Sequence, residues 1–266
     1  LKALSRLPGV EMRPLQEFMG DDFEEAQKYV WRAVNPGTDK YTAIAALRGT
    51  GGYFIRIKPR AKVEDPIQTC FYMAGKMLQA PHNVIVLEEG AEATIITGCT
   101  IMPEVAGLHA GVTEIYVKRG ARLNYVMIHA WNRVAHVRPR SAIKLYEDAE
   151  VVSYYMNLSA VKTLQMYPKY HVLGNGGKVY SASIVLGRTD STLDIGAEVI
   201  LEDYGAAEII SRFIVRDKAR AWARARIIGT SGRGHIECKG LILGDQAELY
   251  SIPELGGLGA GAMLTH

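Results

Sequence analysis

One unit returns along this chain at nearly constant spacing. It consists of an apolar β-branched run, a short acidic or glycine turn that closes on a small residue, and a second apolar run. The small turn residues follow one another at steps of 30, 28, 28 and 29 positions, at Ala91, Ala121, Ala149, Gly177 and Ala206. A repeat of this length with strands on both sides of each turn predicts a stack of coils, each burying its apolar face against the next. The expected fold is therefore a β-solenoid.

The N-terminal part follows a different pattern. Between Pro14 and Val34, apolar residues recur three or four positions apart, with acids early and basic residues late, which is typical of an amphipathic helix. A shorter helix is predicted from Tyr41 to Arg48, and a strand from Tyr53 to Ile57. We expect these helices to cap the first coil and to shield its open edge.

The sequence divides into a predicted helical region over residues 1–50 and a predicted solenoid core over residues 51–266. The composition is 48% apolar and 22% charged, and no apolar run reaches the ~18 to 20 residues of a membrane-spanning helix. The net charge is only +3, and the arginines between Arg212 and Arg233 alternate with apolar residues. This pattern favours a solvated sheet face over a nucleic-acid surface. Neither a membrane nor a nucleic acid is an expected partner.

The three cysteines, Cys70, Cys99 and Cys238, lie far apart and form no CxxC pair. A sparse, odd set favours a reducing compartment, for which we take the cytoplasm. There is also no self-contained zinc or cluster motif, so any thiol chemistry needs spatial neighbours or a second chain. Cys70 falls in a predicted buried strand and is assigned to the core.

Eight short motifs occur in an order that closely resembles the core of the SufB/SufD proteins, the scaffold subunits of the SUF machinery for iron–sulfur cluster assembly. They are Gly98-Cys99-Thr100, Gly107-Leu108-His109, Met127-Ile128-His129-Ala130-Trp131, Val137-Arg138-Pro139-Arg140, Leu164-Gln165-Met166-Tyr167-Pro168, Glu208-Ile209-Ile210-Ser211-Arg212, Gly234-His235-Ile236-Glu237-Cys238 and Ile252-Pro253-Glu254-Leu255. The resemblance covers nearly the whole chain, and the retained cysteines make it similar to SufB, or to an archaeal-type SufB-like subunit. It implies a right-handed parallel β-helix with an N-terminal helical region.

The resemblance also implies roles for three residues. Cys99 is similar to the cysteine that accepts persulfide sulfur from a cysteine desulfurase or a sulfur carrier, a role that requires an accessible thiolate. From the residues alone, a small apolar side chain at a coil corner is the alternative. Cys238 resembles the interface cysteine on which a nascent iron–sulfur cluster is built. His266 matches the histidine of a Thr/Ser-His-Glu motif whose glutamate would be the next residue.

Three further residues have weaker implied roles. His129 and Trp131 match positions that line the sulfur path between the two cysteines, although a packed aromatic pair inside the coil is the alternative. Glu254 follows a proline in a predicted flexible loop and is a candidate oxygen ligand from a neighbouring subunit; a solvated loop carboxylate is the alternative. The remaining histidines have no HxxxH or HxH spacing, which argues against a preformed mononuclear metal centre.

No motif indicates an enzyme that turns over by itself, because Walker, GxSxG and GxGxxG patterns are missing. ATP is expected only through a SufC-type ABC ATPase, docked by a C-terminal helical region that has no counterpart up to His266. The final coil, Gly234 to Ile252, is predicted to leave strand edges unpaired, which favours a homodimer or a heterodimer with a SufB/SufD-type subunit. A SufD-like structural partner without its own cluster and a carbohydrate-active β-helix enzyme remain alternatives.

Overall fold

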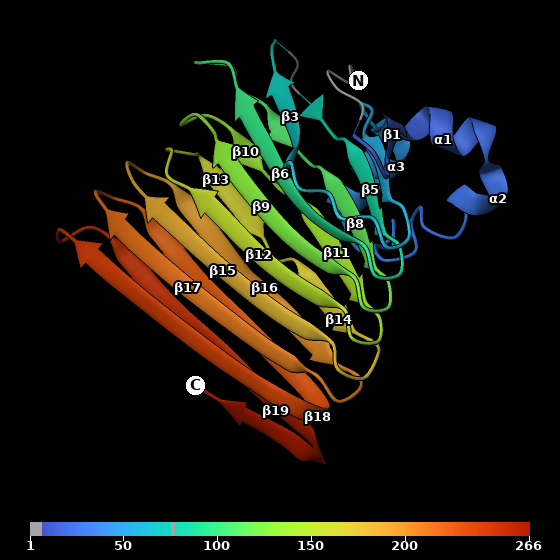
Figure 1. Ribbon diagram of the computed structural model, residues 1–266. Coiled ribbons are helices and arrows are strands. Elements are labelled where there is room, and N and C mark those ends of the chain that lie inside the picture. Colours follow the sequence, from blue (N-terminus) through green and yellow to red (C-terminus); the bar gives the residue numbers. More distant parts are fainter. Residues whose placement is uncertain (1–6, 76–77) are drawn as a thin grey trace.

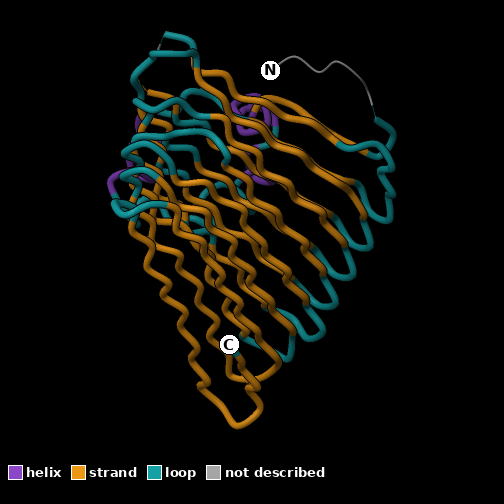
Figure 2. The backbone as a smooth tube through the Cα atoms, turned by 90° about the vertical axis from the view of Figure 1, so that its left-hand side faces the viewer, coloured by secondary structure: helices purple, strands orange, loops and turns teal. Residues whose placement is uncertain are grey.

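The computed structural model describes residues 7–75 and 78–266 and forms a β-solenoid of about eight turns (Figure 1). Strands account for 58% of it and helices for 8%. The turns between strands align along the sides of the stack (Figure 2). The predicted solenoid is therefore confirmed. Among the helices of the described ranges, none has the length and apolar character that a membrane span requires.

The helices and strands of the described chain follow one another as a short N-terminal region and a long series of coils. They are β1 (Val10–Pro14), α1 (Leu15–Asp21), α2 (Phe23–Ala26), α3 (Lys40–Arg48), β2 (Tyr53–Ile57), β3 (Ile67–Met73), β4 (Leu78–Gln79), β5 (His82–Leu87), β6 (Glu92–Ile101), β7 (Leu108–His109), β8 (Val112–Val117), β9 (Arg122–Ala130), β10 (His136–Val137), β11 (Arg140–Leu145), β12 (Glu150–Asn157), β13 (Thr163–Met166), β14 (Lys169–Val172), β15 (Lys178–Gly187), β16 (Thr192–Leu201), β17 (Ala206–Arg216), β18 (Arg220–Leu243) and β19 (Glu248–Thr265).

Successive coils pair through parallel strands whose partners are one repeat apart. From β6 through β9, β12, β15 and β17, the offsets between paired residues are 30, 28, 28 and 28. Because Lys178 pairs with Ala206, the corner residue equivalent to Gly177 is Gly205, and the expected last step of 29 is one residue too long. A Cβ on Gly205 would lie 2.7 Å from the carbonyl oxygen of Gly177. The coils therefore approach too closely for a side chain at this corner.

Each early coil contains three short strands, and prolines stand where one strand gives way to the next. Pro81, Pro139 and Pro168 lie just before β5, β11 and β14, because a proline cannot donate an N–H to the ladder. In the next coil, Ala197 takes the place of Pro168 and β16 runs without a break, pairing with both β13 and β14. A second side of the solenoid is a sheet that continues through all the coils and carries all three cysteines. Its strands are β3, β6, β9, β12, β15, β17 and β18, in that order.

The lumen of the solenoid holds the core. In β6, buried residues alternate with half-buried ones, so that Ala93, Ile95, Thr97 and Cys99 face inward. Inward residues of successive coils join into two large apolar clusters that fill the lumen from coil to coil. Complete burial of one such side chain contributes roughly 1.5–3 kcal/mol. The stacking of coils is therefore the main source of stability.

The N-terminal helices lie beside the coils and do not cap them, so the expected capping arrangement is wrong (Figure 1). The side chain of Phe18 in α1 stacks on Phe54 of β2 with ring centroids 3.7 Å apart. Leu15, Tyr29 and Tyr116 complete this layer on the outward face of β2, β5 and β8. The free edge of β2 is covered by the antiparallel strand β1, which satisfies its backbone groups directly.

The predicted single helix from Pro14 to Val34 is also wrong in part. Asp22 ends α1 and begins α2, where its side chain accepts a hydrogen bond from the backbone N–H of Glu25 at 3.1 Å. The chain then continues through turns, and Trp31 adopts a positive φ of 59°. An aspartate cap inside an apolar periodicity thus breaks the helix. The shorter helix is confirmed as α3, and the predicted strand is confirmed as β2.

A buried carboxylate fastens the N-terminal region to the coils. Glu114 of β8 is completely buried. Its oxygens accept hydrogen bonds from the backbone N–H groups of Trp31, Ala33 and Val34 at 2.6, 2.6 and 3.0 Å. The Nε2 atom of His82 lies 2.7 Å from Oε1. A buried carboxylate is stable only when its oxygens are well satisfied. These contacts therefore hold the segment 31–34 against the second and third coils.

The opposite end of the stack is formed by β18 and β19, and it corrects the prediction of a flexible loop near Glu254. Residues 248–265 form a continuous strand that pairs with β18. Backbone hydrogen bonds to the long strand β18 hold this segment extended, despite the conformational freedom that its glycines give the chain. Within the described chain, β19 pairs on one side only, and residues 236–243 of β18 pair only with β17.

Candidate functional site

Cys99 lies near the first coils and faces the lumen. It pairs with Phe71 of β3 on one side and with His129 of β9 on the other. Only 7% of the residue is exposed. Burial, with a smaller contribution from the charge of Cys70, raises the pKa of the Cys99 thiol to about 12. In this arrangement Cys99 is a protected thiol and does not have the accessible thiolate that its implied role requires.

His129 and Trp131 belong to a packed aromatic cluster next to Cys99. The ring of Trp131 lies 5.0 Å from His129 and 4.9 Å from His109, centroid to centroid. Nδ1 of His129 lies 3.2 Å from the hydroxyl of Tyr155. Burial lowers the pKa of His109 to about 4, and burial together with the nearby His109 lowers that of His129 to about 3. Both imidazoles are therefore neutral near pH 7, and the packed pair that we left open as an alternative describes this geometry.

Cys238 lies at the other end of the same sheet. It is half-buried and faces the lumen from β18, paired with Ser211 of β17. Its outward neighbours Glu237 and Lys239 join in an ion pair of 2.6 Å, which Arg212 extends at 2.7 Å. Burial raises the pKa of the Cys238 thiol, while the hydroxyls of Ser251 and Ser211 and the charge of Arg212 oppose that rise.

The strand that ends at Thr265 runs close to Cys238, whereas Glu254 lies elsewhere. Thr265 is the last paired residue and pairs with His235, three residues before Cys238 on the same strand, and His266 directly follows it. Glu254 pairs with Arg226 on the outward face of a different sheet, where its Oε2 lies 3.2 Å from the guanidinium Nε. Within one chain, Glu254 is therefore a surface ion-pair partner. Its candidate role as a ligand requires a second subunit.

The assignment of Cys70 to the core is wrong. Its strand, β3, exists as predicted, but the buried positions are Ile67, Thr69 and Met73, and Cys70 is exposed on the other face. The alternate residues Gln68, Cys70 and Tyr72 are exposed, so none of the described segments covers that face of β3.

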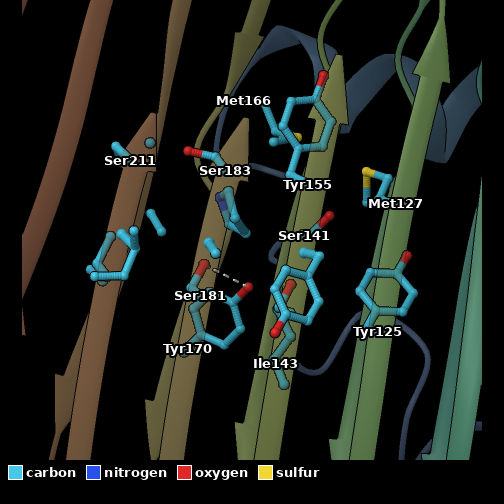
Figure 3. A pocket seen from close by; sticks show the side chains of 18 residues that line it. Tyr125, Met127, Ser141, Ile143, Tyr155, Met166, Tyr170, Ser181, Ser183 and Ser211 are labelled. Atoms are coloured by element: carbon cyan, nitrogen blue, oxygen red, sulfur yellow. Dashed lines mark hydrogen bonds between the residues drawn. The ribbon is translucent and has the colours of Figure 1, made fainter. Parts of the chain in front are cut away.

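Two small cavities lie inside the lumen between the surroundings of the two inward cysteines. The first is lined by Cys99, Thr97 and His129 and has a volume of about 20 Å³. The second, of about 30 Å³, is lined by Tyr155, Ser183 and Ser211 among others (Figure 3). Tyr125, Met127 and Ser141 line both. The two cavities therefore share a wall, and the second one ends at the residue that pairs with Cys238.

The hydroxyl groups along this cavity escaped the sequence analysis. Figure 3 shows Ser181 and Ser183 on β15 and Ser211 on the neighbouring strand β17, with Ser181 hydrogen-bonded to Tyr170 at 3.4 Å. Ser183 pairs with Ser211, and Ser211 pairs with Cys238. The offset of 28 residues places Ser183 and Ser211 in one column, so the repeat itself carried the signal. Single serines in apolar strands had given no reason to apply it.

Across the described ranges, no three His, Cys, Asp or Glu side chains gather in a geometry that could hold a metal ion. Outward acids of the later coils are engaged by arginines, as in the pairs Glu198–Arg226 at 3.0 Å and Glu237–Arg212 at 2.7 Å. The chemistry that the interior offers is therefore that of two inward thiols, hydroxyl groups and neutral imidazoles.

Residues 71–257 match the family model of the SufBD core domain of the SUF system for iron–sulfur cluster assembly. The chain belongs to the SufBD family. A SufBD family protein from Methanothermobacter thermautotrophicus is 40% identical over 255 residues, covering 92% of this chain and 62% of that protein. One from Archaeoglobus fulgidus is 37% identical over 261 residues, covering 97% of this chain and 70% of its own length. A Staphylococcus saprophyticus member is 28% identical over 239 residues.

The names of these SufBD relatives describe iron–sulfur cluster assembly, and the match confirms the resemblance drawn from the eight motifs. The matched core begins in β3 and ends in β19, so it contains Cys99, Cys238 and the cavities between them. The chain spans about 62% of the length of the Methanothermobacter relatives. Activities and partners of a whole SufBD protein are therefore matters for proposal.

Proposed function

We propose that this SufBD chain is a scaffold on which a nascent iron–sulfur cluster is assembled as cargo. Cys99 receives sulfur, the lumen conducts it, and Cys238 holds the cluster at the terminal coil. The observation that carries this proposal is the pair of adjoining cavities between the two cysteines, with Met127 in the shared wall. A carbohydrate-active enzyme has no comparable support, because outward carboxylates such as Glu198 are held by arginine.

The first step is sulfur transfer to Cys99 from a cysteine desulfurase or a sulfur carrier. The Cys99 thiolate attacks the outer sulfur of the donor persulfide, a new S–S bond forms at Sγ, the donor's S–S bond breaks, and the donor leaves as a thiolate. Since Cys99 is buried, the step requires β3 to move. Among the described strands, β3 pairs with β6 alone, so it is held less firmly than β9 on the other side of the cysteine, which pairs with both β6 and β12.

Sulfur then has to travel along the lumen. Cys99 and Cys238 are separated by five strand-to-strand steps, from β6 to β18. At ~4.8 Å per step, this amounts to about 24 Å. Direct contact between the two thiols is excluded by that separation, so the sulfur leaves Cys99 as sulfide. An external dithiol reductant breaks the S–S bond of the Cys99 persulfide, becomes a disulfide and regenerates the Cys99 thiol, and the released sulfide passes through the cavities lined by Met127 and Ser183.

Cluster assembly takes place at the terminal coil in this proposal. Thiolate sulfur is the typical ligand of iron in such clusters, and imidazole can complete the coordination. Cys238 and His266 are the proposed protein ligands. A second SufB/SufD-type subunit, identical or related, pairs with the open edge and supplies the remaining ligands, with Glu254 of a subunit as a candidate. A SufC-type ABC ATPase docks outside the present residues and supplies the ATP-dependent step. All three thiols are free, which suits the reducing cytoplasm.

The test is anaerobic reconstitution of the dimerised protein with ferrous iron and either free sulfide or a desulfurase with cysteine. With free sulfide, Cys238→Ala abolishes the visible absorption of a cluster, whereas Cys99→Ala retains it because supplied sulfide bypasses the entry site. With the desulfurase, both variants fail. Cys70→Ala is the matched control and behaves like the parent protein under both conditions.

The alternatives give different outcomes in the same assay. A protein that dimerises and stays colourless with either sulfur source is a SufD-like structural partner. A cluster that forms equally well in Cys238→Ala contradicts the scaffold proposal, because its terminal ligand would then be dispensable.

A further inference from the structure

Four corners in one row along the solenoid carry an excess of positive charge. They are residues 131–138, 158–163, 187–191 and 216–219, and they adjoin the paired strands β10, β13, β16 and β18. Against two acids, Asp190 and Asp217, these segments contain six cations: Arg133, Arg138, Lys162, Arg188, Arg216 and Lys218. The surplus of six over two is +4, whereas the whole chain has a net charge of only +3. We call these four segments the basic corners.

Titratable groups in the basic corners respond to this charge. The hydrogen bond and the charge of Lys162, with a smaller contribution from Arg133, lower the pKa of the Asp190 carboxyl. The pKa of His136 is lowered by burial and also by the charges of Arg138 and Lys162. Both shifts have the sign that a positive potential produces, because it favours the deprotonated form of each group.

A hollow of about 600 Å³ lies among these charges, and its lining includes Arg133 and Lys162. Lys162 is engaged by Asp190 at 2.5 Å. Arg133 and Arg188, in contrast, form no ion pair with any residue in the described ranges. The hollow therefore offers unpaired positive charge to an anionic ligand.

The surroundings of the hollow favour an acidic polypeptide over a small anion or a nucleic acid. Val134 and Leu158 are 36% and 51% exposed between the cations, and such side chains lose contact with water only against a partner of comparable size. Trp131 is the only aromatic ring of the basic corners apart from His136, and at 5% exposure it cannot stack a base. The complementary ligand is a protein surface that carries carboxylates around an apolar residue.

The basic corners adjoin the coil of Cys99. Cys99 pairs with His129, and Arg133 follows His129 by four residues. Trp131, between them, packs in the same core cluster as Cys99. The strand β3 lies two strand-to-strand steps from β9, or ~10 Å, which a protein interface of roughly 800 Å² per partner can span. A protein that docks over Arg133 thus covers the end of the coil where Cys99 lies.

We propose that the basic corners are the docking surface for an acidic segment of the sulfur-donating protein. Carboxylates of that segment lie against Arg133 and Lys162, and its apolar residue covers Val134. Electrostatic attraction orients the donor beside the coil of Cys99 before β3 moves. The inference rests on the proposed function, because it names the chemistry by which the sulfur donor is recognised.

The first test measures the binding of an acidic probe by fluorescence anisotropy at low salt. The probe is a fluorescein-labelled peptide with a run of glutamates around one leucine, and the same peptide with glutamines is its control. The double variant Arg133→Glu/Lys162→Glu binds the glutamate peptide at least about tenfold more weakly. Lys58→Glu/Arg119→Glu reverses two exposed cations outside the basic corners and keeps the parent affinity. Asp190→Asn removes a negative charge and tightens binding about two- to threefold, which a misfolded surface would not do.

Three outcomes of this test contradict the docking surface. One is equal affinity of the two double variants for the glutamate peptide. Another is displacement of the bound peptide by inorganic phosphate at constant ionic strength, which would indicate a small-anion site. The third is tighter binding of a labelled single-stranded DNA that Arg133→Glu/Lys162→Glu abolishes, which would indicate a nucleic-acid surface.

A second measurement tests the identity of the partner. The protein is incubated with a desulfurase and cysteine in the absence of a dithiol, and persulfide on the Cys99 peptide is followed by mass spectrometry. Its initial rate falls about tenfold in Arg133→Glu/Lys162→Glu and stays unchanged in Lys58→Glu/Arg119→Glu, while reconstitution with free sulfide is the same in both. An unchanged rate in the first variant overturns the assignment of the donor to this surface. A parent protein that never acquires the persulfide contradicts the proposed function, whereas the peptide measurement decides the docking surface separately.

Discussion

Cys99 and Cys238 occupy inward positions of one sheet, yet the two ends of the solenoid surround them differently. Around Cys99, a complete coil lies on each side and the aromatic cluster of His129 and Trp131 closes the lumen. Around Cys238, a complete coil lies on one side and the strand edges of the last coil are open on the other. Within the described residues, Cys99 thus has a paired strand on both sides, whereas Cys238 has one on a single side.

The folding stability should be sensitive to acid because of the region around Cys99, where His109 and His129 are buried. The pKa values of about 4 for His109 and about 3 for His129 lie below the ~6.5 of an unfolded chain. Below pH 6.5, the unfolded state therefore binds protons that the folded state does not, and stability falls as the pH drops toward those lower values. Between pH 7 and pH 4.5, the two histidines together cost about 5 kcal/mol of unfolding free energy. Urea titrations at both pH values measure this loss.

His129→Gln is the control for that titration. Glutamine can keep a hydrogen bond to Tyr155 and carries no titrating group, so this variant should lose about half of the acid-induced destabilisation. A variant that loses as much stability as the parent protein would show that these buried imidazoles are not responsible.

The second contrast is chemical reactivity. With a pKa near 12, Cys99 has a thiolate fraction about 10³-fold below that of an unperturbed thiol at pH 8. We expect peptide-resolved alkylation in the order Cys70, Cys238, Cys99, because these thiols are exposed, half-buried and buried, respectively. Labelling in denaturant should equalise the three rates. Equal rates in the native protein would mean that β3 opens readily and that the N-terminal coils are not closed.

Much of this comparison was accessible from the sequence. The repeat predicted the stack, and the eight motifs predicted the family. The buried, inward position of Cys99 was not predicted, because the sequence suggested either an accessible thiolate or a small side chain at a coil corner. What could not be predicted depends on contacts across coils. The hydrogen bonds to Glu114 and the exposure of Cys70 follow from register and from which sheet faces are covered. Local periodicity does not contain that information.

The third test concerns the hydrogen bonds that hold the N-terminal segment 31–34 to Glu114 in the first coils. Glu114→Ala should lower the unfolding free energy by about 3 kcal/mol, because the backbone N–H groups of Trp31, Ala33 and Val34 lose their common acceptor. Chemical denaturation monitored by tryptophan fluorescence measures the change. Glu150→Ala is the matched control: its carboxylate forms only partly exposed pairs, at 2.6 Å from Lys178 and 3.4 Å from Arg122, so it should cost no more than about 1 kcal/mol. A similar cost for both variants would mean that the N-terminal segment is held by its apolar layer alone.

The smallest expected effect concerns the open end. Leu241 is 53% exposed at the free edge of β18, beside exposed Ile242 and Leu243. If a second subunit pairs there, Leu241→Lys loses roughly 1.5–3 kcal/mol of apolar burial and weakens the dimer at least tenfold. Sedimentation equilibrium measures the dissociation constant, and Leu158→Lys, an equally exposed leucine (51%) outside the final coil, is the matched control. Equal dimer stability in both variants would contradict pairing through the terminal coil, and the openness around Cys238 would then need a different occupant.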